Sequence, residues 1–187
     1  MVHLYLARHG ETIENATKIL QGHLPGHLNE KGKRQAAELR NKLMISQVRF
    51  DGIVVSDLQR ALDTVEIVNE TFALPVTTTP LLRERDWGSL TGISLSNRHI
   101  ETFPDDIESI EALFQRAAKF LQYVLTDFEG KTILAVGHGL FNRCILASIS
   151  GQTIQDIPAM KNAEIREIIL NDNSFSKSTA DEIPATN

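Results

Sequence analysis

The chain has 187 residues, 42% of them hydrophobic, and its 19 Lys and Arg against 24 Asp and Glu give a formal charge of −5. A chain of this length can bury a sufficient core as one domain without disulfides or metal. Its acidic balance excludes a strongly basic nucleic-acid-binding protein. The charge is unevenly spread, because residues 1–60 hold 9 basic and 6 acidic side chains. A basic first third on an acidic protein points to an anionic ligand.

Cysteine content and hydrophobic runs indicate where the protein works. Cys144 is the only cysteine, so no disulfide can form within the chain, which suits a reducing compartment. No apolar run approaches the roughly 20 residues of a membrane span, and the first residues lack the pattern of a secretion signal. These observations predict a cytoplasmic protein with no membrane segment.

Predicted strands and helices alternate along the chain. Asn29 is a candidate helix cap, and 80–107 contains no long periodic run. In chain order, the hydrophobic patterns predict a strand over 2–7, a helix from 29 to about 45, a strand over 50–55, a helix over 58–68, a strand over 76–79, a long loop over 80–107, a helix over 110–125, a strand over 132–136, a helix over 140–149 and a strand over 164–170.

This alternation predicts an α/β fold, a three-layer α/β/α sandwich around a mostly parallel sheet. We expect a single domain over residues 1–170, with a short lid insertion at about 93–107. Residues 171–187 are polar, rich in Ser and Thr, and without periodicity. They are predicted to form a tail outside the domain.

Charged residues follow the ends of three predicted strands. Arg8 and His9 come directly after the first strand, His138 follows the strand over 132–136, and Arg60 lies one helical turn beyond the strand over 50–55. In open α/β sheets, ligands bind just beyond the carboxyl ends of the strands. If the first and fourth strands are neighbours, two histidines and two arginines face one crevice. Guanidinium groups match phosphate oxygens, and Glu84, in the loop after the third strand, is a candidate proton donor.

Several ordered motifs, covering roughly residues 2–170, resemble those of the histidine phosphatase superfamily, also called phosphoglycerate mutase-like. A single Arg-His-Gly triplet would be weak evidence, whereas several ordered motifs at fitting strand ends are a strong signal. The motifs are Leu6-Ala7-Arg8-His9-Gly10-Glu11-Thr12 with Asn15, Gln21-Gly22 and the stretch 28–32, Ser56-Asp57-Leu58-Gln59-Arg60-Ala61, Leu82-Arg83-Glu84, Glu108-Ser109 with Arg116, and Val136-Gly137-His138-Gly139.

The resemblance implies a role for each matching position. His9 would be the nucleophile that forms a phosphohistidine, and Glu84 would be the general acid for the leaving group and then the base for water. Gln21 and Gly22 would line the substrate side. The residues implied to bind the phosphoryl group are Arg8, Asn15, Arg60, His138 and Gly139. The implied mechanism needs neither a metal nor another cofactor.

The favoured function is that of a phosphomonoesterase acting on a small phosphorylated metabolite. A mutase is the first alternative, but the glycolytic mutases of this family carry a larger insertion after the acid loop. Arg98 and His99, inside the short insertion here, keep that alternative open. A non-catalytic protein that binds phosphorylated ligands is the second alternative, disfavoured because both His9 and Glu84 are present.

Other polar or reactive residues favour structural interpretations. His23 and His27 are four residues apart, but the intervening Pro-Gly breaks any helix that could make them metal ligands. Trp87 is expected to pack at the pocket rim, and Cys144 to be a core residue. Glu84 itself lies among charged neighbours, so a solvated charge cluster is the competing interpretation of its position.

Overall fold

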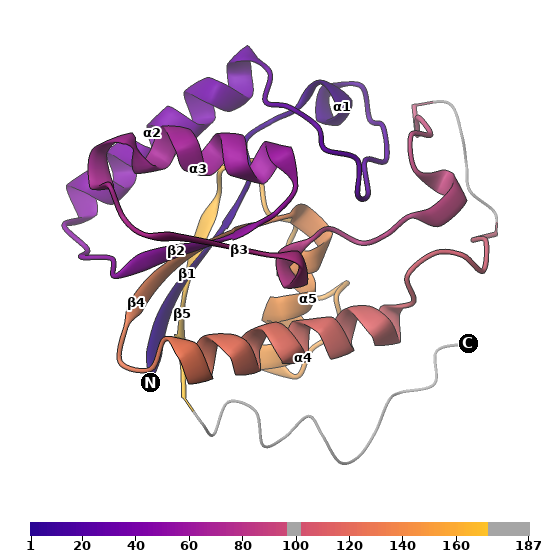
Figure 1. Ribbon diagram of the computed structural model, residues 1–187. Helices are drawn as coiled ribbons and strands as arrows, with labels where there is room; N and C mark the ends of the chain where they lie inside the picture. Colours follow the sequence, from indigo (N-terminus) through magenta and orange to yellow (C-terminus); the bar gives the residue numbers. More distant parts are fainter. Residues whose placement is uncertain (97–101, 172–187) are drawn as a thin grey trace.

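A computed structural model describes residues 1–96 and 102–171 (Figure 1). Arg98 and His99, part of the predicted lid, lie outside the described residues, as does the predicted tail beyond Asn171.

The predicted order of strands and helices is confirmed, with small differences in their ends. The short helix α1, two 3₁₀ turns η1 and η2 in the predicted loop, and the antiparallel direction of β5 were not predicted from the sequence. The elements are β1 (Val2–Arg8), α1 (Ile13–Ala16), α2 (Glu30–Ser46), β2 (Gly52–Ser56), α3 (Gln59–Phe72), β3 (Val76–Thr79), η1 (Pro80–Leu82), η2 (Gly88–Leu90), α4 (Ile110–Asp127), β4 (Thr132–Gly137), α5 (Gly139–Ser150) and β5 (Ile165–Leu170).

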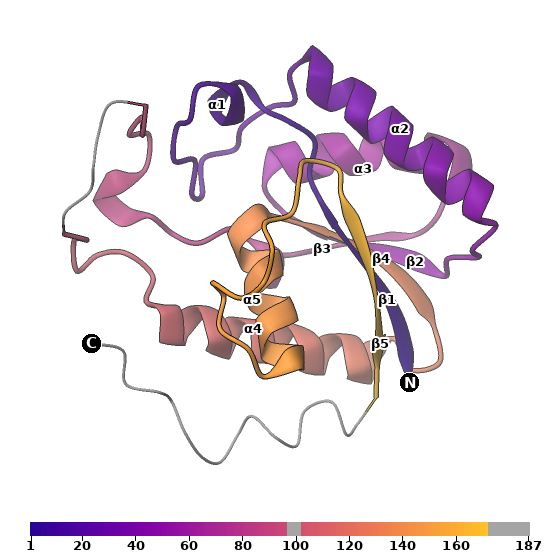
Figure 2. The same ribbon diagram turned by 180° about the vertical axis from the view of Figure 1, so that it is seen from behind.

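Within the described residues the strands form one sheet in the order β3-β2-β4-β1-β5, parallel except for β5, which runs antiparallel to β1. Helices α2 and α3 cover one face, and α4 and α5 cover the other (Figures 1 and 2). Two hydrophobic clusters fill the two interfaces. This is the predicted three-layer α/β/α sandwich.

Burial explains why the central strands were readable from the sequence. All five residues of β2 are buried, as are all but the first of β4, because parallel strands with helices on both faces need continuous apolar runs. Asn29 caps α2, its side chain accepting a hydrogen bond from the Gly32 amide. No helix in the part of the chain that the structure describes is long and apolar enough to cross a membrane.

The sheet order brings the predicted site residues to one edge. β4 lies between β1 and β2, and Arg8 is in register with Gly137 at the carboxyl ends of β1 and β4. The rings of His9 and His138 are 5.1 Å apart between their centroids. The expectation that the two histidines meet because their strands are neighbours is confirmed.

Candidate active site

His9 follows β1 directly and is almost completely buried. Its Nδ1 lies 2.6 Å from the carbonyl oxygen of Gly10. A carbonyl oxygen only accepts hydrogen bonds, so Nδ1 carries the ring proton and Nε2 keeps its lone pair. Burial, followed by the nearby charges of Arg60 and Arg8, holds the pKa of His9 well below its usual range. His9 is therefore a neutral imidazole whose Nε2 can act as a nucleophile.

Close backbone packing fixes the turn that carries His9. The amide of Gly10 donates a hydrogen bond of 3.0 Å to Thr64 Oγ1 on α3. A Cβ atom at Gly10 would lie 2.5 Å from the carbonyl oxygen of Gly32 on α2. Only glycine at this position allows α2 to approach the turn so closely.

His138 is the cap residue before α5 and is fully buried. The Nε–H of Arg60 donates to His138 Nδ1 at 3.1 Å, so His138 is protonated on Nε2, which lies 2.8 Å from Ser56 Oγ. Burial, with the charge of Arg60 as the next cause, keeps the pKa of His138 well below its usual range. In this structure His138 is neutral, and both ring nitrogens are engaged by protein groups.

Arg60 reaches from α3 into the centre of the site and is 1% exposed. Its Nη1 donates to the carbonyl oxygen of Leu24 at 2.5 Å, and its Nη2 donates to that of Gly22 at 2.9 Å. Burial lowers the pKa of Arg60 to about 10, and the charge of Glu84 acts in the opposite direction. Arg60 therefore stays charged at neutral pH and anchors the 22–25 loop to the two histidines.

Arg8 brings a second cation to the same edge of the sheet. Its Nη1 donates to the carbonyl oxygen of Met160 at 2.7 Å. Its Nε is buried and has no hydrogen-bond partner among residues 1–96 and 102–171. A Cβ atom at Gly139, the first residue of α5, would lie 3.2 Å from Arg8 Nε. A buried guanidinium N–H beside the start of a helix is suited to binding an anion.

Asn15, predicted to bind phosphate, is linked to His9 through a residue that the sequence analysis missed. Asn162 Nδ2 lies 3.2 Å from Asn15 Oδ1 and 3.1 Å from the carbonyl oxygen of His9. The Thr12 amide also donates to Asn15 Oδ1. Two donors on the oxygen fix the orientation of the Asn15 amide, and its NH₂ group has no hydrogen-bond partner among the residues that the structure describes. Asn162 lies in a stretch without periodicity, so no local pattern marked it.

Glu84 follows η1, and its carboxylate lies at the start of α5. Glu84 Oε2 accepts from the Leu140 amide at 3.1 Å, while Oε1 accepts from the amides of Phe141 at 3.1 Å and Arg85 at 2.8 Å. This favourable contact with a helix N-terminus differs from a solvated charge cluster. The Glu84 charge also raises the pKa of Arg8, opposing the larger effect of burial. The structure thus brings Glu84 to the edge that holds the two arginines.

Gln21 and Gly22 lie on the loop that Arg60 anchors. Gln21 is buried, and its Oε1 has no hydrogen-bond partner within the described ranges. Gly22 has a φ of +49°, which favours glycine, and a Cβ there would meet Thr91 Oγ1 at 3.0 Å and the Trp87 amide at 3.3 Å. Gly22 therefore lets this loop pack against the 87–91 segment.

His23 and His27 each lie beside a protein oxygen. His27 lies 3.3 Å from Asp63, and His23 Nε2 lies 3.0 Å from the carbonyl oxygen of Glu84. No cluster of three or more His, Cys, Asp or Glu side chains suited to a metal occurs in the described part of the chain. Cys144 is buried in the core, which raises its pKa to about 12.

The lowered pKa of His9 gives a prediction about its titration. We expect its ring to remain neutral as pH falls through 6.5, and to protonate only well below that value. The urea-unfolded chain should titrate near the ordinary histidine pKa of about 6.5. Histidine ring NMR signals measure the titration midpoint in the folded protein and in the urea-unfolded chain. The His9 signal is assigned by its loss in a His9→Ala variant.

A midpoint for His9 at or above 6.5 in the folded protein would contradict the neutral nucleophile. Circular dichroism must accompany the titration. The unfolded chain binds more protons than the folded protein below its histidine pKa, so stability is lost as pH falls through that range.

Comparisons with known proteins show that the chain is similar to proteins named as phosphatases and as mutases. The sequence model of the histidine phosphatase superfamily (branch 1) matches residues 4–181. The chain is 36% identical over 155 residues to the uncharacterized phosphatase PhoE of Bacillus subtilis, covering 81% of this chain and 79% of that protein. It is 29% identical to the probable phosphoglycerate mutase GpmB of Cronobacter sakazakii, covering 89% and 80%. The solved structure of Bacillus stearothermophilus YhfR superposes with a TM-score of 0.85 at 28% identity, covering 92% and 93%.

Proposed function

Because this chain belongs to the histidine phosphatase superfamily (branch 1) and its relatives include named phosphatases, we propose that it hydrolyses phosphate monoesters through a phosphohistidine on His9. The observation that carries the proposal is the state of the His9 ring. It is buried, its Nδ1–H points at the Gly10 carbonyl, its pKa is held well below the usual histidine range, and its Nε2 has no hydrogen-bond partner among the described residues.

In the first step, the Nε2 lone pair of His9 attacks phosphorus and the bond from phosphorus to the ester oxygen breaks. Glu84 gives a proton to the departing oxygen, so an alcohol leaves. In the second step, water attacks the phosphoryl group, Glu84 takes a proton from that water, and the bond from phosphorus to nitrogen breaks. The products are the alcohol and inorganic phosphate, and His9 and Glu84 return to their starting states.

Fixed positive groups supply the charge stabilisation that this transfer needs. Arg8 and Arg60 would bind the phosphoryl oxygens, with Asn15 Nδ2 and the Gly139 amide as further donors. His138 would join them by turning its Nε2–H from Ser56 to a phosphoryl oxygen. Two arginines and a helix N-terminus supply this charge without a metal or another cofactor.

The substrate we propose is a small phosphorylated metabolite whose leaving group lies beside Gln21 and Gly22. Glu84 accepts three backbone N–H bonds, which fix the position of its carboxyl group beside the start of α5. Cys144 as a buried thiol is consistent with the cytoplasm as the site of action.

Trapping the covalent adduct tests this function. The protein is mixed with a ³²P-labelled phosphate ester and quenched within milliseconds. We expect label on the protein that survives base, is lost in acid, and maps to the peptide containing His9. Inorganic phosphate should then appear at the rate at which the adduct disappears. A phosphatase reaction with no trappable adduct, or one mapped to another residue, would contradict the mechanism.

The alternative is a mutase, favoured by the name of the GpmB relative. In that case the label from His9 would pass to a second hydroxyl of an organic phosphate rather than to water. The same experiment with and without a diphosphorylated cofactor separates the two functions. Release of inorganic phosphate that is independent of the cofactor supports the phosphatase.

A further inference from the structure

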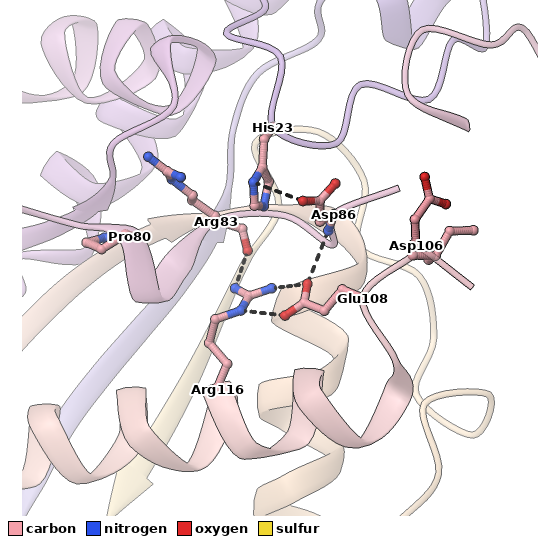
Figure 3. A pocket seen from close by; sticks show the side chains of 8 residues that line it. His23, Pro80, Arg83, Asp86, Asp106, Glu108 and Arg116 are labelled. Atoms are coloured by element: carbon pink, nitrogen blue, oxygen red, sulfur yellow. Dashed lines mark hydrogen bonds and ion pairs between the residues drawn. The ribbon is translucent and has the colours of Figure 1, made fainter. Parts of the chain in front are cut away.

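Resting on the proposed function of Glu84 as the proton donor, we infer that Arg116, oriented by Glu108, is a positioning residue that fixes Glu84 from outside the pocket. Within the described residues, neither side chain hydrogen-bonds to Arg8 or Arg60, the arginines proposed to bind the phosphoryl group. Glu108 comes two residues before α4 and Arg116 lies in the second turn of that helix, below the segment that carries Arg83 and Asp86 in Figure 3.

Every N–H of the Arg116 guanidinium has a partner. Its Nε and Nη2 donate to the two carboxylate oxygens of Glu108, at 2.9 and 2.7 Å. Its Nη1 donates to the carbonyl oxygens of Leu81 at 3.1 Å and Arg83 at 2.6 Å, and its Nη2 also donates to that of Glu84 at 3.3 Å. One planar group thus ties the main chain of the acid loop to α4.

The carboxylate end of Glu84 is connected to the same arginine. The Arg116 guanidinium lies 3.9 Å above the ring of Phe141, and the amide of Phe141 donates to Glu84 Oε1. Arg116 therefore contacts both the carbonyl of Glu84 and the residue that holds its side chain. Moving the guanidinium would disturb Glu84 at both ends.

Glu108 extends the support beyond Glu84. Its Oε2 accepts from the Asp86 amide at 3.1 Å, and its carbonyl oxygen accepts from Arg85 Nε at 2.8 Å. On the other side of the loop, His23 Nε2 lies 3.0 Å from the Glu84 carbonyl oxygen. The main chain over 83–86 is thus held by polar contacts from two directions.

Side-chain packing does not replace these contacts. A cavity of about 440 Å³ lies against this side of the loop, lined by Arg83, Asp86, Glu108 and Arg116 among others (Figure 3). Because the loop faces a cavity here, hydrogen bonds to Arg116 and Glu108 are what fix its position on this side. Lysine in place of Arg116 keeps the charge but has three donors at a single point, so it cannot bridge one carboxylate and three carbonyls.

The test compares Arg116→Lys with Arg143→Lys, in wild type and in Glu84→Gln. Arg143 is a matched control, because it is also half-buried and donates to carbonyl oxygens, those of Ile154 and Ile157, away from Glu84. Single-turnover rates are measured on an alkyl phosphate, which needs a proton on its leaving oxygen, and on nitrophenyl phosphate, which does not.

We expect Arg116→Lys to slow the alkyl phosphate on the order of 10- to 100-fold, as for a misplaced catalytic group, and nitrophenyl phosphate by less than about threefold. In the Glu84→Gln background, Arg116→Lys should leave the ratio of the two rates at the value measured for Glu84→Gln alone. Arg143→Lys should leave the ratio of the two rates at the wild-type value, even if it lowers the melting temperature as much as Arg116→Lys does.

Equal losses on both substrates, or an undiminished effect of Arg116→Lys in Glu84→Gln, would overturn the positioning role. If Glu84→Gln alone shows no dependence on the leaving group, the acid assignment fails and the inference with it. Should Arg116→Lys not fold, Glu108→Gln decides, since it keeps the size of the side chain and removes the charge that orients Arg116. It should show the same selective loss on the alkyl phosphate.

Discussion

The protein with His9→Ala is expected to lose phosphatase activity by on the order of 10⁵-fold or more, in line with the effect of deleting other covalent nucleophiles. It should give no labelled adduct after incubation with a phosphate ester. The physical reason is that Nε2 of His9 is the group proposed to form the bond to phosphorus. Steady-state kcat/KM and quench-flow labelling measure the two effects.

His3→Ala is the control for this variant. His3 lies at the opposite end of β1 from the site, where its ring is 3.9 Å from Glu167. It should retain wild-type kinetics. The His9→Ala protein must keep a native circular dichroism spectrum. Near-wild-type turnover in a folded His9→Ala protein would move the nucleophile to another group, with His138, 5.1 Å away between ring centroids, the first to test.

Arg60→Lys is expected to be the second most damaging change. Lysine cannot hold His138, Leu24 and Gly22 at once, as the arginine does. We expect kcat/KM to fall about 10²-fold or more, as for loss of one preorganised donor to developing charge. Stability should fall by roughly 2–4 kcal/mol, because buried acceptors lose their partners at about 1–3 kcal/mol each.

Arg143→Lys again serves as the comparison, now for a loss of stability without a loss of phosphate binding. Calorimetry with inorganic phosphate and urea unfolding separate the two effects of Arg60→Lys. Wild-type affinity for phosphate together with wild-type kcat/KM would show that Arg60 serves the 22–25 loop alone and does not bind the phosphoryl group.

The parts of this fold that could be predicted are those whose physics is local. The continuous apolar runs of β2 and β4 require burial on both faces, so they mark central parallel strands. Asn29 marks the start of α2 because its side chain caps the helix. Arg8, His9 and His138 could be grouped in advance because carboxyl ends of neighbouring parallel strands meet at one edge.

What the sequence did not reveal depends on contacts between distant segments. No pattern around Asn162 indicates that its amide bridges Asn15 and His9. Glu84 contacts the first turn of α5 at Leu140 and Phe141, which lie 56 and 57 positions further along the chain. Arg116 stood out only as part of a motif, although a charged residue between the buried Leu113 and Ala117 of an amphipathic helix was a usable signal.

The link between Arg8 and the 160–163 segment has a consequence for how the protein is made. The hydrogen bond from Arg8 to Met160 spans 152 positions, and the one from Asn162 to His9 spans 153. Contacts of such long sequence separation are slow to form, because the intervening chain must first be ordered. During synthesis His9 is made 153 positions before Asn162, so the contact that holds the His9 main chain can form only after the segment that carries Asn162 has left the ribosome.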